Sequence, residues 1–274
     1  MTNPSADITV YITTHNRVEM LKRAVQSVLN QTMQVNEIII VDDYSTDGTQ
    51  EYCLELANNY NNIKYIRNAT NLGAPESRNR AIISAKSKYI TGLDDDDEFK
   101  SNRIKKLYTF YTSNNYSFIC DNITVNNKII NNYSGEIDLD KLLYFNIVGS
   151  QIFTLTNNLR AVNGFNVEYP AWQDYDTWVK IIKRFGVCYK MKGSSYIAHT
   201  EHEERITNGK KQTEAFIMFL KNNIHHMNTK HIISLFLIFK MLASEKVKYS
   251  DYKYLLITGN IKRFLGFIKR SIKK

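Results

Sequence analysis

Residues 38–49 read Ile-Ile-Ile-Val-Asp-Asp-Tyr-Ser-Thr-Asp-Gly-Thr, and this stretch decides the fold class of the chain. A run of β-branched apolar residues is typical of a short strand that is buried on both faces. The Asp, Ser, Thr and Gly residues after it favour a turn that leads into a helix. A buried strand followed by a polar turn and a helix is the repeating unit of an α/β protein.

The same unit recurs along the first part of the chain. Short apolar runs and helical spacing of apolar residues predict strands at residues 8–13, 64–67 and 89–93, and helices at residues 21–29, 52–57, 76–85 and 174–185. This alternation predicts a Rossmann-like, mostly parallel sheet flanked by helices. Beyond residue 102 the pattern loosens into mixed strands and helices, and from about residue 213 it is helical.

Length and composition fit a globular protein. The 274 residues, 43% hydrophobic and 23% charged, suffice for one large domain or for one domain with an appendage. The polar start lacks the charged and apolar regions of a signal peptide, so we expect a cytoplasmic chain. Cys53, Cys120 and Cys188 form no CxxC pair, and we expect buried, reduced thiols.

The positive charge is concentrated at the carboxyl end. Residues 230–274 hold eleven Lys or Arg and two acids, so their net charge of +9 equals that of the whole chain. Residues 261–274 alternate bulky apolar and cationic side chains, which suits a helix lying in an anionic membrane interface. A packed helix with solvated lysines and a nucleic-acid-binding segment are the alternatives. The apolar run at 232–239 is shorter than the roughly 20 residues of a membrane-spanning helix.

Polar residues follow each of the expected strands, in the clusters 13–17, 42–49, 71–79 and 94–97. Parallel sheets bind ligands beyond the carboxyl ends of their strands, so we expect these clusters to meet at one edge. Taken singly, each has an ordinary structural explanation. Residues 42–49 could only cap a helix, and Arg17 and Arg78 could be solvated residues in a first turn.

The acidic run Asp94-Asp-Asp-Asp97 is the strongest of these signals. Adjacent carboxylates after a buried strand repel one another, and hard oxygen ligands suit Mg²⁺ or Mn²⁺. In an extended segment Asp94 and Asp96 would share a face and reach one ion. A solvated acidic loop is the alternative. The chain has no Gly-x-Gly-x-x-Gly after its first strand and no phosphate-loop Gly-Lys-Ser/Thr, which argues against a dinucleotide oxidoreductase and a phosphate-loop NTPase.

Residues 171–178 open a later helix. Asp174 could simply cap that helix, or it could be a general base facing an acceptor. On the second interpretation, Trp172 would offer an apolar platform to a sugar face. Sugar choice would then depend on a pocket walled by loops, including residues 146–152.

Together these stretches resemble the family-2 inverting glycosyltransferases, which have the GT-A fold. The resemblance lies in residues 13–17, 41–49, 71–79, 93–97 and 173–176, in the order of that family. The family usually has an aromatic residue at the position of His15 and Glu at that of Gln173. The resemblance implies a donor site formed by Thr13, His15, Arg17, Asp43, Arg78, Asp94 and Asp95. It further implies metal ligation by Asp96, Asp94 and His202, with His199 competing for the role of His202, and a catalytic base at Asp174.

The implied function is inverting transfer of a sugar from a nucleotide-diphosphate donor, expected to be a UDP-sugar, to an acceptor hydroxyl, with Mn²⁺ or Mg²⁺ as cofactor. The acceptor is expected to be a glycan linked to polyprenyl diphosphate, in surface polysaccharide or O-antigen assembly, at the inner face of the cytoplasmic membrane. We expect a catalytic domain at 1–205 and a basic helical extension at 206–274, with no nucleic-acid partner. A metal-dependent nucleotidyltransferase and a non-enzymatic basic membrane- or nucleic-acid-binding module are the alternatives.

Overall fold

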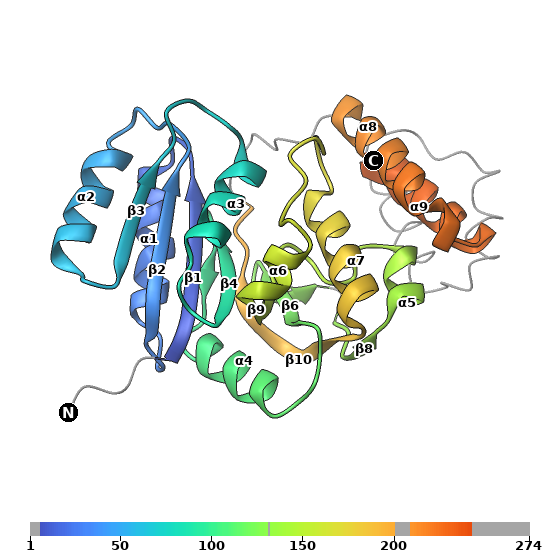
Figure 1. Ribbon diagram of the computed structural model, residues 1–274, viewed down its shortest axis with the longest axis horizontal. Helices are drawn as coiled ribbons and strands as arrows, with labels where there is room; N and C mark the ends of the chain where they lie inside the picture. Colours follow the sequence, from blue (N-terminus) through green and yellow to red (C-terminus); the bar gives the residue numbers. More distant parts are fainter. Residues whose placement is uncertain (1–5, 131, 201–208, 243–274) are drawn as a thin grey trace.

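The computed structural model describes residues 6–130, 132–200 and 209–242 (Figure 1). Its strands are β1 (Ala6–Thr14), β2 (Val35–Asp42), β3 (Ile63–Arg67), β4 (Tyr89–Asp94), β5 (Glu98–Phe99), β6 (Ile119–Val125), β7 (Lys128–Ile130), β8 (Gly135–Ile137), β9 (Phe153–Leu155) and β10 (Cys188–Ile197). Its helices are α1 (Val18–Leu29), α2 (Thr49–Asn59), α3 (Ala74–Ser84), α4 (Arg103–Thr112), α5 (Leu139–Tyr144), α6 (Thr156–Ala161), α7 (Gln173–Phe185), α8 (Gly209–Asn223) and α9 (Thr229–Leu242), with a short 3₁₀ helix, η1 (Ile224–His226).

One sheet runs through the molecule in the order β3-β2-β1-β4-β9-β6-β10-β5, with β7 paired to β6 and β8 paired to β10. Strands β1 to β4 are mutually parallel, as predicted. The chain adds β2 and β3 on one side of β1 and then returns to place β4 on the other side. The strand order therefore reverses at β1, and the carboxyl ends of β1 and β4 form the switch point at which such sheets bind ligands.

The second half of the sheet is mixed. Strand β9 lies antiparallel between β4 and β6, whereas β6 and β10 are parallel to each other. The insertion of β9 brings the segment just before it, residues 146–152, against the carboxyl end of β4. This is the loop that the sequence analysis expected to shape the sugar pocket.

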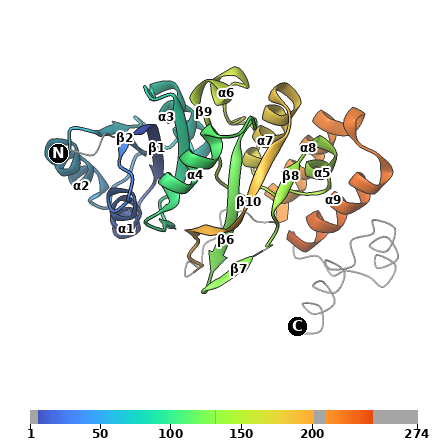
Figure 2. The same cartoon turned by 90° about the horizontal axis from the view of Figure 1, so that it is seen from below.

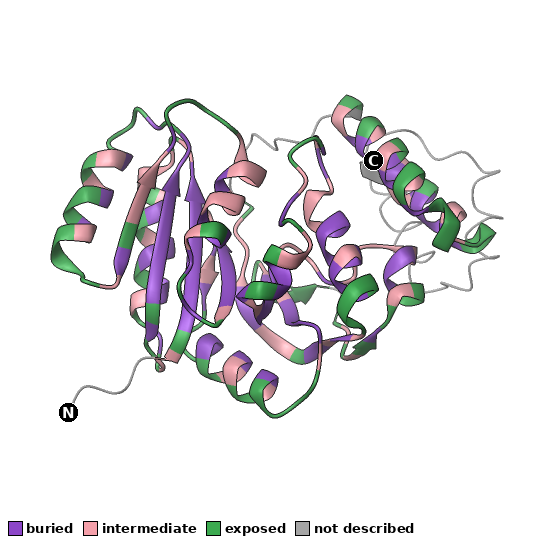
Figure 3. Cartoon of the chain, viewed as in Figure 1, coloured by how far each residue is buried: buried purple, intermediate pink, exposed green. Residues whose placement is uncertain are grey.

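Alternate side chains of β1 pack into two hydrophobic cores, one on each face of the sheet. On one face Val10 and Ile12 pack with residues of α1, α2 and α4, and on the other face Tyr11 packs with residues of α3, α6 and α7. Figure 3 shows the buried strands between helices whose outer faces are exposed. The cysteines at 53, 120 and 188 are all buried and free, which confirms the prediction of reduced thiols.

Helices α8 and α9 pack on α5 and α7, at the opposite end of the molecule from α2 and β3 (Figures 1 and 2). Phe219 of α8 stacks on Tyr175 at 4.2 Å between ring centroids, and Ser234 of α9 donates to the Tyr144 carbonyl at 2.9 Å. These helices confirm the expected helical extension as far as residue 242. In the part of the chain that the structure describes, no helix has both the length and the apolarity needed to cross a membrane. The basic segment 261–274 lies outside the described residues.

Candidate functional site

The polar clusters after β1, β2 and β3 meet, as predicted. His15 Nδ1 lies 2.8 Å from the main-chain oxygen of Asp43. The buried Asp43 carboxylate accepts hydrogen bonds from the main-chain N–H groups of Leu72, at 2.8 Å, and Gly73, at 2.7 Å, and from Asn68 Nδ2 at 2.7 Å. Asp43 therefore fixes the loop that leads into α3 and sets the position of this wall of the site.

The helix-cap interpretation is right for one acid of the 42–49 turn. Asp47 Oδ1 accepts from the main-chain N–H and hydroxyl of Thr49, at 3.2 and 2.6 Å, where α2 begins. Asp47 Oδ2 also accepts from the Val18 N–H, at 2.9 Å, where α1 begins. The turn therefore holds both a structural acid, Asp47, and an acid that faces the site, Asp43.

The aspartate quartet does not continue the strand. Asp94 ends β4, and a turn follows in which the Asp97 N–H donates to the Asp94 carbonyl at 3.1 Å. The expectation that Asp94 and Asp96 share the face of an extended segment was therefore wrong. Instead Arg17 Nη1 reaches both Asp95 Oδ1, at 3.2 Å, and Asp96 Oδ2, at 3.3 Å.

Each acid of the quartet has its own environment. Asp94 Oδ1 accepts from Arg78 Nη2 at 2.9 Å. Burial raises the pKa of Asp95 to about 6 and that of Asp97 to about 8, which favours the protonated form of the Asp97 carboxyl. The mutual repulsion predicted from the sequence is thus reduced by arginines and by protonation.

Asp174 lies in the first turn of α7. Burial raises the pKa of its carboxyl to about 6, against the opposing effects of the Tyr175 N–H, 2.8 Å from Oδ1, and the charge of Arg78. Arg78 therefore interacts both with Asp94 at the end of β4 and with Asp174 at the start of α7. Arg78 is thus an ion-pair partner of Asp94, and its charge is also felt by Asp174.

The remaining predicted residues have these positions. Thr13 pairs with Asp94 across β1 and β4. The Trp172 ring meets Phe216 and Phe219 of α8 edge to face, and its Nε1 donates to Gln212 at 2.7 Å, so its acceptor role stays a prediction. His199 Nε2 lies 2.7 Å from Glu98 Oε1. His202 lies outside the described residues.

Sequence reasoning missed two amides that touch the acids of the site. Gln151 Nε2 donates to Asp94 Oδ1 at 2.9 Å, and Asn146 Nδ2 donates to Asp174 Oδ2 at 3.1 Å. One sequence signal pointed to the first, because a glycine inside a strand often marks the close approach of another group. A Cβ added to Gly92 would lie 2.0 Å from Gln151 Oε1. The signal did not say which residue approaches.

An acid that binds a metal ion must be accessible and must offer a suitable donor atom. The Asp96 side chain is 25% exposed, whereas that of Asp95 is 7% exposed. An accessible carboxylate suits Mg²⁺ or Mn²⁺ if phosphate oxygens complete the coordination shell. Among the described residues, no group of three or more His, Cys, Asp or Glu could hold a metal by itself. The donor set thus fits a metal that is shared with a bound diphosphate.

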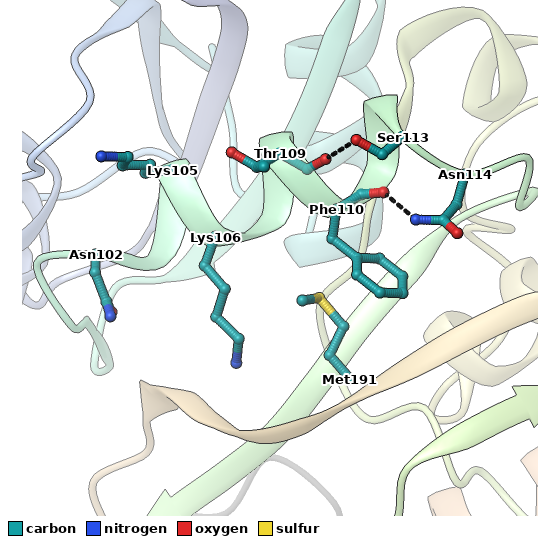
Figure 4. Close-up of a pocket in the computed structure, with 8 residues that line it drawn as sticks. All are labelled: Asn102, Lys105, Lys106, Thr109, Phe110, Ser113, Asn114 and Met191. Carbon is teal, nitrogen blue, oxygen red and sulfur yellow. Dashed lines mark hydrogen bonds between the residues drawn. The ribbon is translucent and has the colours of Figure 1, made fainter.

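A separate hollow of about 530 Å³ lies between α4 and β10 (Figure 4). It is lined by Asn102, Lys105, Lys106, Thr109, Phe110, Ser113, Asn114 and Met191. None of the predicted site residues is among them, and Lys106 Nζ already bonds Asp121 Oδ2 at 3.1 Å. We therefore assign the chemistry to the carboxyl ends of β1 and β4.

The parallel sheet carries arginine-paired acids beyond its switch point, which is where α/β proteins of this class bind their ligands. A match to a family model identifies the family of the chain. The model of Glycosyl transferase family 2 matches residues 9–169, and the chain belongs to this family.

Known proteins support the same assignment. WcaA of Escherichia coli (strain K12), a glycosyl transferase assigned to colanic acid biosynthesis, is 32% identical over 228 residues, 79% of this chain and 81% of WcaA. Escherichia coli WfgD, named a UDP-Glc:alpha-D-GlcNAc-diphosphoundecaprenol beta-1,3-glucosyltransferase, is 28% identical over 180 residues, 64% of this chain and 70% of WfgD. The crystal structure of S. aureus TarS 1-349 is 17% identical, with a TM-score of 0.67, and the match covers 92% of this chain and 78% of that one. This last likeness shows the shared GT-A fold.

Proposed function

We propose that the chain transfers a sugar from a UDP-sugar to an acceptor hydroxyl with inversion at the anomeric carbon. The observation that carries the proposal is Arg78, which lies 2.9 Å from Asp94 and whose charge also acts on the carboxyl of Asp174. It joins the donor side of the site, at the switch point of the sheet, to a carboxylate that can serve the acceptor. The solved complexes of S. aureus TarS 1-349 with UDP and with UDP-GlcNAc support the choice of donor.

The donor would lie across the carboxyl ends of β1, β2 and β4. We assign the uracil and ribose to Thr13, His15 and Asp43, with Asp94 approaching the ribose. Arg17, Arg78 and Asp95 would line the same donor site. The fixed Asp43 loop and the bond from His15 to the Asp43 main chain support this assignment, because they hold this wall in place before the nucleotide arrives.

We assign the divalent cation to Asp96, which with Asp94 is one of the two partly exposed acids of the quartet, with Asp94 and His202 as further predicted ligands. When bound, Mn²⁺ or Mg²⁺ would stabilise the negative charge that grows on the leaving diphosphate. Arg17 already contacts Asp96 and is close enough to share that charge.

Asp174 would act as the general base. Its carboxylate would take the proton of the acceptor hydroxyl while that oxygen bonds the anomeric carbon and the bond from this carbon to the phosphate oxygen breaks. Attack from the face opposite the leaving group inverts the configuration in a single displacement. A pKa of about 6 leaves the carboxyl mostly ionised at neutral pH yet more basic than an exposed aspartate.

The test is Asp174→Asn, with UDP-sugar turnover and UDP affinity both measured. We expect transfer to fall by about 10²-fold or more, because general-base catalysis contributes roughly that factor, while UDP binds as in the wild type. Equal loss of UDP affinity would show that the role is misassigned. Product analysis separates a nucleotidyltransferase, because that enzyme would release diphosphate in place of UDP.

We further propose that the acceptor is a lipid-linked glycan and that the chain works at the inner face of the cytoplasmic membrane. The activity named for WfgD, on a diphosphoundecaprenol-linked sugar, supports the acceptor class. Helices α8 and α9 expose Ile217 to 59% and Phe236 to 38%. These apolar side chains, followed by the basic residues 243–274, are consistent with a catalytic domain at 1–205 and a membrane-facing extension at 206–274.

A further inference from the structure

The segment that carries Asn146 is fastened to α7 at two points. Asn146 Nδ2 donates to Asp174 Oδ2 at 3.1 Å, and one helical turn further on Trp178 Nε1 donates to the Gly149 carbonyl at 2.8 Å. Asn146 also closes its own turn, because its Oδ1 accepts from the Gly149 N–H at 3.1 Å. Its Nδ2 also donates to the Gly149 carbonyl at 3.3 Å, so the Asn146 amide closes its own turn with both of its polar atoms and donates to Asp174 with the nitrogen.

The other end of this segment reaches the donor side of the site. Gln151 donates to Asp94 Oδ1 at 2.9 Å and accepts from the Tyr11 hydroxyl at 3.2 Å. Residues 146–151 thus span the distance between Asp174 and Asp94 with one amide at each end. A segment anchored at both carboxylates keeps them at a constant separation.

We propose that Asn146 is a positioning residue for Asp174, fixing the plane of the carboxylate so that a remaining lone pair faces the acceptor hydroxyl. The inference deepens the proposed function and rests on the role given there to Asp174. Oδ1 of Asp174 is bonded by the Tyr175 N–H at the helix start, and Oδ2 by Asn146, so the plane of the carboxylate is set from two sides.

The same bond has an electrostatic consequence. In the described part of the chain, the charged groups that face Asp174 are Arg78 from α3 and Asp94 from β4. Burial already raises the pKa of Asp174 to about 6. The Asn146 N–H favours the ionised form, so its loss raises the pKa further, by about one pH unit for a typical hydrogen bond to a charged group.

Two substitutions test the donor while differing in what they leave of the turn, because Nδ2 serves both Asp174 and the Gly149 carbonyl. Asn146→Ala removes both the acceptor and the donor. Asn146→Asp keeps an oxygen that can accept from the Gly149 N–H but removes the donor and adds a negative charge. Asn158→Ala is the matched control, because the buried Asn158 amide donates to the Ser117 carbonyl, at 2.9 Å, and does not touch Asp174.

The measurement is the ¹³C titration of the Asp174 carboxyl, assigned with Asp174→Asn, together with the pH profile of UDP release from UDP-glucose and UDP-N-acetylglucosamine. We expect the titration midpoint to rise by about one unit in Asn146→Ala and by more in Asn146→Asp. At pH 6 the ionised fraction, and the turnover with it, would fall about five-fold, with recovery above pH 8. Asn158→Ala should lower the melting temperature and leave both midpoints unchanged.

An unchanged titration midpoint in Asn146→Asp would overturn the inference, since it would reduce the amide to a turn-closing role. The carboxyl titration needs no turnover, so it stands apart from the proposed function. If Asp174→Asn kept full activity, the base assignment would fail even with a shifted titration. If Asp174→Asn were inactive and the titration unshifted, only the inference about Asn146 would fail.

Discussion

Asp43→Asn tests how the donor wall is held. The carboxylate accepts three hydrogen bonds, from Leu72 N–H, Gly73 N–H and Asn68 Nδ2, and it is buried. An asparagine amide has the same shape but only one accepting oxygen. Whichever way the amide turns, its NH₂ group faces at least one main-chain N–H group, and that donor is left without an acceptor.

The size of the effect follows from these contacts. The amide keeps most bonds if its oxygen takes the place of Oδ1 and its nitrogen faces the Gly73 N–H. A hydrogen bond to a charged acceptor contributes about 1.5–3 kcal/mol, and an unpaired buried donor costs about 1–3 kcal/mol. We expect the free energy of unfolding to fall by about 3 kcal/mol, or the melting temperature by roughly 6–12 °C for a chain of this size.

Thermal unfolding followed by circular dichroism measures the loss of stability, and titration with UDP measures the affinity for the nucleotide. We expect UDP affinity to fall together with stability, since Asp43 holds both the Leu72–Gly73 loop and the main-chain contact with His15. Asp7→Asn removes the same charge from an exposed position and is the control. A melting temperature within 2 °C or so of the control would refute the reasoning, because a lost buried bond must cost more than that.

The other predictions address the metal, the strand glycine and the membrane. Asp96→Ala should cut turnover by about 10²-fold or more and abolish its response to Mn²⁺; full activity in the variant or in chelator would contradict the metal proposal. Gly92→Ala should lower the free energy of unfolding by about 1–3 kcal/mol in urea, because the new Cβ would lie 2.0 Å from Gln151 Oε1 and 2.4 Å from the Tyr11 ring. Removal of residues 245–274 should reduce flotation with anionic liposomes; equal recovery of the two forms would defeat the membrane proposal.

The first half of the fold was predictable because its physics is local. Each of the strands β1 to β4 is a short apolar run, and the segments between them have apolar residues at helical spacing. This alternation predicts that the strands are parallel. The meeting of residues 13–17 with residues 42–49 and 71–79 then follows from the geometry of a parallel sheet. The antiparallel insertion of β9 was not predictable in this way. It depends on pairing between Ile90 and Thr154, which are distant in the chain and carry no turn signal that links them.

The amides of the site escaped prediction for a related reason. Asn and Gln have no periodic or charge pattern, so Asn146 and Gln151 look like ordinary loop residues until the fold brings them to Asp174 and Asp94. Their partners Asp94 and Asp174 stood out in the sequence because they are charged, and their roles in the reaction stay predictions. The sequence therefore pointed to the charged groups, whereas their neutral partners needed the structure.

The aspartate quartet shows what charge repulsion does and does not imply. From the sequence alone, the mutual repulsion of four adjacent carboxylates predicts a bound cation. In the structure Asp94 has Arg78 and Gln151, Asp95 has Arg17 and a pKa of about 6, and Asp97 has a pKa of about 8. Repulsion alone therefore does not require a metal here. The argument for a metal rests instead on Asp96, which is partly exposed and lies beside the Arg17 guanidinium. That guanidinium could stabilise a diphosphate as negative charge grows on it. The charges of the site are thus balanced before the donor binds, and a bound ion would add to the contact that Asp96 already makes with Arg17.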